Sequence, residues 1–365
     1  MDYRDVSLLP PHFTRIKKKR FAPDGRLWQS APSAAMTKGG RIFCVYSADN
    51  SHPDEVTTNY TVCAYSDNGG ESYELAFYAY HDYEVRMSET LLFMSPEGVL
   101  YHFWTQSYKY FDGRGGIWCV KCENPDADIP KFTRPKRICD GFMADNPVVM
   151  RDGRWMFPSS VWTHITPEIH HFPEYEKASV WQSLDKGKTL SYVGGVVTPV
   201  PDFTENTVFE KADGTLVMLF RTESYAGGIN ISKSKDGGKT WSEPKPFVIP
   251  GPSSRFMVSR FPSGNLLIVT HHEFTGRNNL TALLSDDDGE TWRYPLLLDE
   301  RNSVSYPSGN ITPDGKCVLC YDRERTGAKE ILLASFTEED MRNGSFGKNS
   351  FTKKLVCKGG TDTGV

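Results

Sequence analysis

The chain has 365 residues, 38% of them hydrophobic and 13% aromatic, with 31 glycines and 23 prolines, a composition typical of an all-β protein with an ample core. Its formal net charge of −4 excludes a general attraction to nucleic acid or to an anionic membrane, so an anion site needs locally clustered arginines. No window approaches the roughly 18 apolar residues of a membrane-spanning helix. The N-terminal segment lacks the apolar stretch of a signal peptide, so we expect a cytoplasmic protein, or a secreted one if a leader has been removed.

A turn that contains glycine separates two apolar runs at six places along the chain. The turns read KGG, PEG, RDG, ADG, PSG and PDG, and their glycines are Gly40, Gly98, Gly153, Gly214, Gly264 and Gly315. Two apolar runs joined by a short glycine turn predict a β-hairpin. The series therefore predicts six hairpins.

A second series of turns follows these hairpins. An octet of the form S-x-D-x-G-x-T-W, an Asp-box, is complete at 234–241 and 285–292, lacks the aromatic residue at 183–190, and has a conservative variant at 66–73. Its Ser and Asp oxygens accept backbone N–H bonds in a tight turn, its glycine supplies a positive φ, and its tryptophan covers the sheet below. The last three copies start 51 residues apart, and the gap of 117 residues after the first start has room for a degenerate copy. One further step of 51 reaches the apolar segment 331–336, where no octet survives.

The two series run in step, which predicts six four-stranded units and hence a six-bladed β-propeller. Such a ring uses nearly all of the chain, so we expect one domain over residues 1–365, with about 20 N-terminal residues as a closing strand or arm. The order in each unit is strand A, glycine turn, strand B, loop, strand C, Asp-box, strand D. Both kinds of turn then share one face of the disc, and the starts of strands A and the ends of strands B converge on the opposite face, where a ligand site can form.

Polar side chains mark that opposite face. Arginine forks bind carboxylates in bidentate fashion, so Arg221 and Arg255 are suited to hold an acidic sugar. A tyrosine whose proton is removed by a glutamate is a nucleophile suited to attack beside a carboxylate, and an acid on a loop beside an anionic cleft is well placed as a general acid. Some of these residues also have a purely structural alternative. Tyr306 can be a core or rim aromatic, the loop acids can belong to a solvated turn, and Arg86 and Glu89 of blade 2 can pair with each other. In chain order the candidates are Arg26, Asp49, Asp54, Arg86, Glu89, Gln106, His164, Glu205, Arg221, Arg255, His271, Tyr306, Asp322, Arg323 and Arg325.

The sequence gives two weak hints of a metal site. Cys119 with Cys122, and Cys317 with Cys320, have a zinc-like spacing, but both pairs lie in predicted strands, where positions three apart face opposite sides. We therefore expect free thiols. The histidines and glutamates of the insertion at 164–176 match no ligand signature, which favours a loop that covers the substrate. No metal and no other cofactor is expected.

The octets and the polar residues together resemble the sialidase (neuraminidase) superfamily of Asp-box six-bladed propellers, over essentially the whole chain. The resemblance implies that Tyr306 is a nucleophile and that Glu205 activates it. The acid/base of that superfamily lies in the loop before the first Asp-box, where Asp54 is the best match and Asp49 the second. The resemblance also implies an exo-acting glycosidase.

The resemblance assigns the substrate carboxylate to arginines. Arg221 and Arg255 correspond to two of a triad, and Asp322 corresponds to a carboxylate that holds an arginine. Sialidases begin blade 1 with Arg-Ile-Pro, the first arginine of the triad, whereas this chain has Ser-Ala-Pro at 30–32. The ligand is then not sialic acid, or the missing arginine is replaced by one of four others: Arg26, Arg86, Arg323 or Arg325.

We therefore expect a retaining exo-glycosidase of the sialidase type, which releases a terminal acidic sugar from a glycan. Sialic acid is the first candidate for this sugar. Asp54 protonates the leaving oxygen, and Tyr306 with Glu205 attacks the anomeric carbon. Gln106 and His164 are further candidate substrate contacts. One alternative is a glycosidase or lyase that acts on uronic-acid glycans, with His164 or His271 transferring the proton. Another is a carbohydrate-binding propeller without catalysis.

Overall fold

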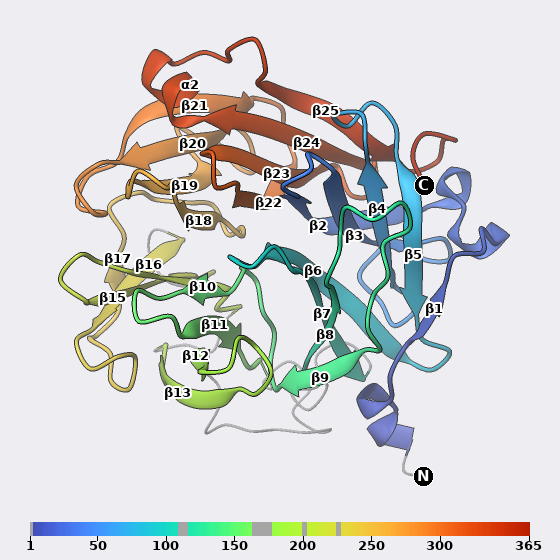
Figure 1. The fold of residues 1–365 in the computed structure, drawn as a ribbon, viewed down its shortest axis with the longest axis horizontal. Helices are drawn as coiled ribbons and strands as arrows, with labels where there is room; N and C mark the ends of the chain where they lie inside the picture. The colour runs from blue at the N-terminus through green and yellow to red at the C-terminus, as the bar shows by residue number, and fades with distance from the viewer. Residues whose placement is uncertain (1–2, 109–115, 163–176, 199–202, 224–227) are drawn as a thin grey trace.

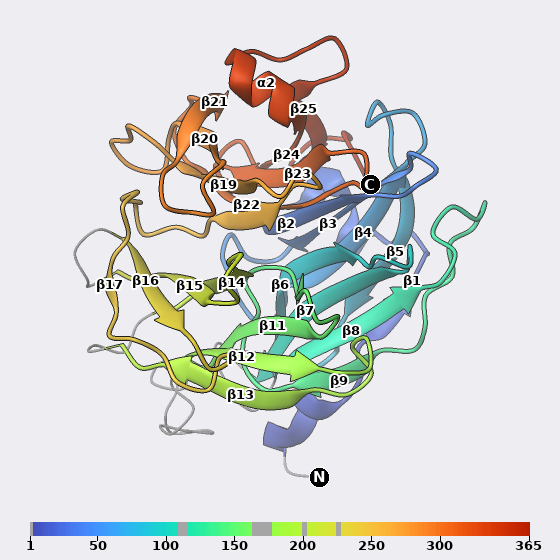
Figure 2. The ribbon, with the colours of Figure 1, turned by 60° about the vertical axis from the view of Figure 1, so that its left-hand side comes forward.

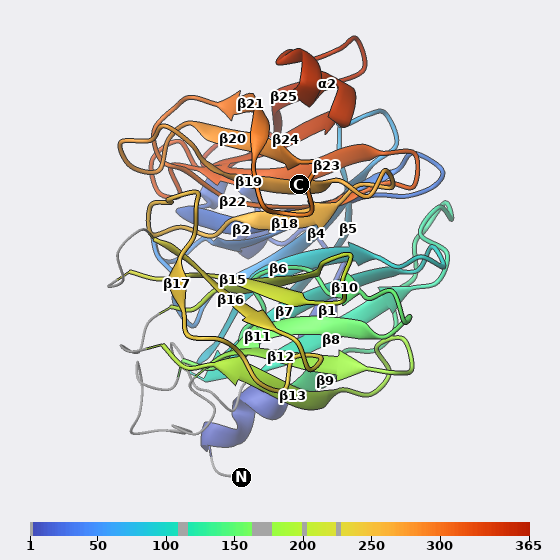
Figure 3. The same ribbon diagram turned by 90° about the vertical axis from the view of Figure 1, so that its left-hand side faces the viewer.

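The strands of the protein form six separate sheets arranged around one axis, a six-bladed β-propeller, as the two series of turns predicted (Figure 1). The computed structural model describes residues 3–108, 116–162, 177–198, 203–223 and 228–365. Views turned about the vertical axis show the helix α2 (Glu338–Asn343) at the rim, on the opposite side of the molecule from β9 (Lys136–Cys139) and β13 (Ser191–Val196) (Figures 2 and 3). Among the described residues no helix has the length and apolar character needed to span a membrane.

Each sheet is antiparallel, and its four blade strands lie side by side in the order in which they occur in the sequence. The first of the four lies nearest the axis. Three short 3₁₀ helices precede the ring: η1 (Tyr3–Leu8), η2 (Lys19–Phe21) and η3 (Pro23–Gly25). The blades are, in order, β2 (Trp28–Met36), β3 (Ile42–Asp49), β4 (Tyr60–Ser66) and β5 (Glu74–Tyr80), with β1 (His12–Thr14) added at the outer edge; β6 (Val85–Met94), β7 (Leu100–Tyr108), β8 (Ile117–Cys122) and β9 (Lys136–Cys139); β10 (Val148–Val149), β11 (Trp155–Ser160), β12 (Ala178–Ser183) and β13 (Ser191–Val196); β14 (Asn206–Glu210), β15 (Leu216–Arg221), β16 (Ile229–Ser234) and β17 (Lys245–Pro246); β18 (Met257–Arg260), β19 (Leu266–His271), β20 (Leu280–Ser285) and β21 (Arg293–Asp299); and β22 (Val304–Ile311), β23 (Lys316–Arg323), β24 (Glu330–Thr337) and β25 (Phe351–Lys358).

The glycine turns join the first and second strands of all six blades. The six predicted glycines have φ between 82° and 96°, a conformation that side chains with a Cβ rarely adopt. The prediction of six hairpins is confirmed at each of Gly40, Gly98, Gly153, Gly214, Gly264 and Gly315.

The four Asp-boxes share one hydrogen-bond pattern. The opening serine Oγ accepts the amide of the glycine four residues on at 2.8–2.9 Å, and the Asn or Asp accepts the amide four residues beyond it at 2.8–3.0 Å. In the glycine turn of blade 4, the amide of Ala212 donates to Asp288 in the Asp-box of blade 5 over 2.5 Å. The two kinds of turn therefore share a face of the disc, as expected.

Two blades lack an Asp-box. In blade 2 the β8–β9 connection is an irregular turn in which the amide of Ala127 donates to the carbonyl of Asn124 over 3.3 Å. In blade 6 the helix α2 stands between β24 and β25, and its first turn is closed by a capping box between Thr337 and Asp340. The missing sixth octet is thus replaced by a different local device.

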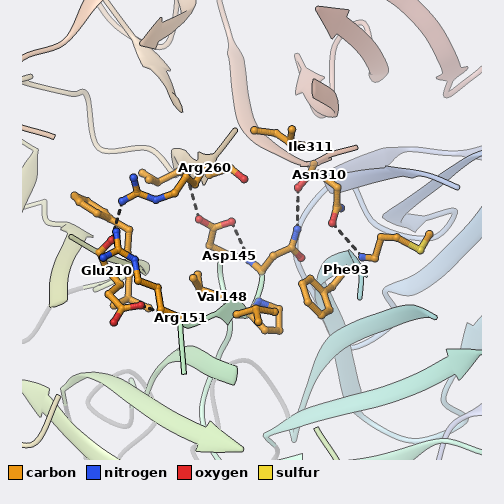
Figure 4. Close-up of a pocket in the computed structure, with 17 residues that line it drawn as sticks. Phe93, Asp145, Val148, Arg151, Glu210, Arg260, Asn310 and Ile311 are labelled. Atoms are coloured by element: carbon orange, nitrogen blue, oxygen red, sulfur yellow. Dashed lines mark hydrogen bonds between the residues drawn. The ribbon is translucent and has the colours of Figure 1, made fainter. Parts of the chain in front are cut away.

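Side chains at the axis tie the blades together on the side of the glycine turns. Asn310 of blade 6 donates to the carbonyls of Ala34 in blade 1 and Leu92 in blade 2, over 3.0 and 2.6 Å. Asp145, which precedes β10, accepts the amide of Val258 in blade 5 over 3.3 Å. A cavity of about 260 Å³ lies among these residues, lined by the first strands of blades 2 to 6 (Figure 4). The polar bonds therefore fix the hub on which the opposite face is built.

Candidate active site

Four of the predicted residues meet in one buried cluster. Nη1 of Arg221 lies 2.7 Å from Oε2 of Glu205 and 3.2 Å from the phenol oxygen of Tyr306. Nη2 of Arg255 lies 3.1 Å from the other carboxylate oxygen of Glu205. All four residues are at most 6% exposed. Segments from blades 4, 5 and 6 thus bring a phenol, a carboxylate and two guanidinium groups together.

The backbone at Tyr306 is a β-bulge. Tyr306 has φ of 55°, and the register of β22 against β23 shifts between Ser305 and Ser308. Equivalent bulges occur in two other blades. They carry Glu89 in β6 and Ala31 in β2, with φ of 55° and 50°. Left-handed φ costs a non-glycine residue roughly 1–2 kcal/mol, and a bulge re-aims a side chain, so strain of this kind is typical of functional positions.

Three guanidinium groups lie over the ring of Tyr306. The distances from the guanidinium carbon to the ring centroid are 4.0 Å for Arg325, 4.4 Å for Arg255 and 5.4 Å for Arg277. Arg277, which the sequence did not single out for a role, also donates to the carbonyl of Ser253 over 2.6 Å. Cations over an aromatic face are attracted by its quadrupole, so the ring is fixed in place.

Arg325 is the arginine that pairs with Asp322. Its Nε lies 3.3 Å from Oδ2 of Asp322, which also accepts a bond of 2.6 Å from Oγ of Ser30. Ser30 stands where the superfamily has the arginine of Arg-Ile-Pro. Of the four replacements that the sequence left open, the structure brings Arg325 to this carboxylate, while Arg323 pairs with Glu330 at the outside of the cluster.

The loop acid that reaches the arginines is Glu55. Its Oε2 lies 2.9 Å from Nη2 of Arg86, and its Oε1 lies 3.8 Å from Nη1 of Arg325. Asp54, which the sequence favoured, is exposed and accepts the amide of Glu55 over 2.8 Å. The expectation that the Asp54 carboxylate joins the cluster is therefore wrong, because neighbouring residues of a turn point in different directions.

Asp49, the second choice for the acid, is fully buried and organises this loop. Its Oδ1 accepts the amides of Ser51 and His52, and its Oδ2 accepts Oγ1 of Thr58 and Nδ2 of Asn59. The acceptor positions of this carboxylate are all used within the loop. Asp49 therefore stabilises the loop and is not placed to donate a proton to a substrate. Asp49 thus positions the segment that carries Glu55.

Arg26 is buried away from the cluster, so its predicted substrate contact is not seen. It donates to the phenol oxygens of Tyr46 and Tyr60 over 2.9 and 3.2 Å, and to the carbonyls of Phe21 and Val365. These bonds join the segment that precedes blade 1 to Val365. Arg26 is a structural residue.

The remaining predicted residues have other partners or no description. Gln106 is buried and its Nε2 donates to the carbonyls of Ser7 and Leu9 over 2.6 and 2.7 Å, so it fixes the N-terminal segment instead of facing the cluster. His271 is 1% exposed, with Nδ1 2.8 Å from the carbonyl of Asn278, and burial lowers its pKa to about 4. His164 lies outside the described residues.

The electrostatics of the cluster are nearly balanced. The largely buried described groups are four arginines and four carboxylates: Arg86, Arg221, Arg255 and Arg325, with Glu55, Glu89, Glu205 and Asp322. The partly exposed Arg277 and the 43% exposed Glu223 lie at the edge of this set. Burial lowers the pKa of Arg255 to about 10. Burial acts in the same direction on Arg221, but Glu205 and Tyr306 outweigh it and raise the pKa of Arg221 above its ordinary value.

A family model described as a BNR repeat-like domain matches residues 80–319. The chain belongs to this family. Two sialidases are similar to this BNR propeller in sequence, each with 28% identity. The match to the sialidase of Bacteroides fragilis runs over 191 residues and covers 49% of this chain and 31% of the relative. The match to the sialidase of Micromonospora viridifaciens runs over 131 residues and covers 32% of this chain and 20% of the relative. The chain spans about a third or less of these curated relatives. The family and these relatives place it in the sialidase superfamily, as its motifs predicted.

Solved structures share the fold of this BNR propeller at low sequence identity. The Hadza microbial sialidase Hz136 has a TM-score of 0.68 and 17% identity, with 88% of this chain and 68% of that chain covered. The intramolecular trans-sialidase of Ruminococcus gnavus has a TM-score of 0.61 and 13% identity, with coverages of 88% and 97%. A protein of unknown function from Dyadobacter fermentans has a TM-score of 0.64 and 16% identity, with 88% of this chain and 98% of that chain covered. At these identities the likeness shows the fold alone.

Proposed function

We propose that the protein is an exo-acting glycosidase of the sialidase type, which releases a terminal acidic sugar from a glycan with retention of configuration. The observation that carries the proposal is the contact set of Arg221, which binds Glu205 and the phenol of Tyr306 within one buried cluster. A phenol, a carboxylate and several arginines are the groups that a tyrosine-based glycosidase of acidic sugars needs.

The first step forms a covalent bond between the phenol oxygen of Tyr306 and the anomeric carbon. The phenolic proton passes to Glu205 and the bond to the leaving oxygen breaks. Nη1 of Arg221 contacts both groups, so it stabilises the negative charge that develops on the phenol oxygen. Water then attacks the anomeric carbon from the face that the leaving group has vacated, opposite Tyr306, and the bond to the phenol oxygen breaks. The two inversions give net retention.

The leaving oxygen receives its proton from Glu55. Asp54 is exposed, whereas the side chain of Glu55 is 15% exposed and contacts Arg86 at the cluster. The same arginines, Arg86, Arg255 and Arg325, are suited to hold the carboxylate of the sugar, since guanidinium forks match carboxylates.

The proposal is tested with a fluorogenic sialoside and a parallel panel of glucuronides. We expect release of sialic acid, with the α-anomer as first product in an NMR time course, and a fall in kcat of at least about a thousandfold in Tyr306→Phe. No release from any sialylated substrate by the folded protein would refute the sialic acid assignment. An unsaturated uronide, seen by its absorbance, would identify a lyase instead.

A further inference from the structure

Glu55 lies where three arginines from different blades meet. Arg86 of β6 is 2.9 Å from its Oε2, Arg325 beyond β23 is 3.8 Å from its Oε1, and Arg255 before β18 contributes a third positive charge to its surroundings. Glu89 pairs with Arg86 and Arg255, Glu205 with Arg255, and Asp322 with Arg325, so three further carboxylates are acidic neighbours of the same arginines. The three arginines form a carboxylate-binding site, and the side chain of Glu55 occupies it.

Glu55 is the replaceable member of this set. Glu89, Glu205 and Asp322 stand on or next to the inner strands and have side-chain exposures of 4%, 3% and 0%, whereas Glu55 stands on a loop and is 15% exposed. The side chain of Arg255 is 1% exposed, and among the described residues its Nε and Nη1 have no acceptor. A buried guanidinium with unused donors favours an additional anion.

Charge balance decides what happens when that anion arrives. Among the described residues, four largely buried arginines already face four largely buried carboxylates, so a fifth carboxylate would add a negative charge that no further described buried cation balances. Uncompensated charge in a site of low dielectric is costly. Binding of an acidic ligand therefore requires that one carboxylate leave or be protonated, and Glu55 is the one free to do so.

We propose that Glu55 is an internal ligand of the Arg86, Arg255 and Arg325 site, and that an acidic sugar binds by exchange with it. The choice of an acidic sugar rests on the proposed function. The carboxylate of the sugar takes the arginines, and the displaced Glu55 takes up one proton from solvent. The Glu55 carboxyl group then carries the proton that the leaving oxygen receives.

The linkage to pH follows from the two environments of Glu55. Burial raises its pKa, but Arg86, Arg325 and Arg255 outweigh burial and hold the pKa below its ordinary value in the free protein. Exchange removes these cations and adds the charge of the ligand, so the pKa of Glu55 rises in the complex. Binding then takes up a proton at any pH between the two values, and affinity weakens as pH rises through the higher one.

The test is calorimetry with the non-hydrolysable 2-deoxy-2,3-dehydro derivative of sialic acid, with N-acetylglucosamine as neutral probe. Measurements at pH 5.5 in buffers of different ionisation enthalpy give the number of protons taken up. In Glu55→Gln, which removes the charge and keeps the shape, we expect binding at least about tenfold tighter than in the wild type and no proton uptake. Glu84→Gln removes the same charge from an exposed side chain two residues before Arg86, and it should bind like the wild type.

Three results would overturn the exchange: binding by Glu55→Gln that is no tighter than in the wild type, binding by the wild type without proton uptake, or no binding of the acidic probe to either protein. Glu55→Ala, with its melting temperature, checks that a gain in affinity does not depend on the glutamine. Turnover of the sialoside is measured separately. A wild type without turnover, beside a gain of affinity in Glu55→Gln, would reject the proposed reaction and keep the exchange.

Discussion

Arg221 connects Tyr306 to its carboxylate. One nitrogen of its guanidinium group lies 3.2 Å from the phenol oxygen and 2.7 Å from Glu205, so the phenol and the carboxylate share a donor. Charge that forms on either oxygen is felt by the same group. The three side chains should therefore act as one unit in catalysis.

The first prediction concerns this unit. Glu205→Gln should lower kcat for a sialoside by at least about a hundredfold, and Tyr306→Phe by at least about a thousandfold. The double variant should be little worse than Tyr306→Phe alone, because the effects of residues that act as a unit are not additive. Steady-state kinetics of the three proteins measures this. Additive losses in the double variant would show that Glu205 and Tyr306 act separately.

The second prediction concerns Arg325. Arg325→Lys keeps the charge but loses the fork that contacts Asp322 and Ser305, so we expect KM for an acidic substrate to rise by about tenfold or more, with a smaller change in kcat. Arg323→Lys is the matched control, since Arg323 pairs with Glu324 and Glu330 outside the cluster. Equal effects in the two variants would argue against a role for Arg325 in binding.

The fold was predictable because its signals are local. A glycine turn needs one residue with positive φ, and an Asp-box closes on itself within eight residues, so both can be recognised in the sequence and both occur as expected. Their alternation also predicted which strand ends lie at the face of Glu205 and Tyr306. Regular repeats thus gave the blade in which each of these residues lies.

The direction of single side chains was not predictable in the same way. Asp54 and Glu55 are neighbours in one loop. The bonds that Asp49 accepts from this loop, and the contact of Glu55 with Arg86 from the next blade, fix which of the two carboxylates turns inward. Arg26 occupies the position of a site residue at the start of blade 1, but Val365, at the opposite end of the sequence, meets it there. Contacts between segments so far apart have no signal in the local pattern.

The third prediction follows from the buried position of Arg26. Arg26→Gln removes the buried donor to the phenol oxygens of Tyr46 and Tyr60 and one of the two donors to the carbonyl of Val365, which should lower the free energy of unfolding by on the order of 3 kcal/mol. Urea unfolding measures the change, with Arg134→Gln at an exposed site as the control. The kinetic constants of the folded variant should stay unchanged. A loss of activity at unchanged stability would return Arg26 to the substrate site.

The fourth prediction concerns Asp145 at the hub. Burial raises its pKa from 3.8 to about 6, against the opposing bonds from Thr207, Asn146 and Val258. A carboxyl group whose folded pKa lies above its unfolded pKa stabilises the fold when protonated, and this contribution is complete below the unfolded pKa and is lost as pH rises through about 6. Relative to Asp145→Asn, the wild type should therefore lose about 2 kcal/mol of stability between pH 4 and 6.5.

Urea unfolding of the wild type and Asp145→Asn across that pH range measures the difference. A constant offset between the two proteins reports the altered hydrogen bond to Val258, whereas a difference that grows with pH reports the ionisation of Asp145. Asp24→Asn, at an exposed carboxylate, should follow the wild type at every pH. Parallel curves for wild type and Asp145→Asn would mean that the carboxyl group is ionised at the hub over the whole range, with Val258 and Asn146 supplying enough hydrogen bonding to hold the charge.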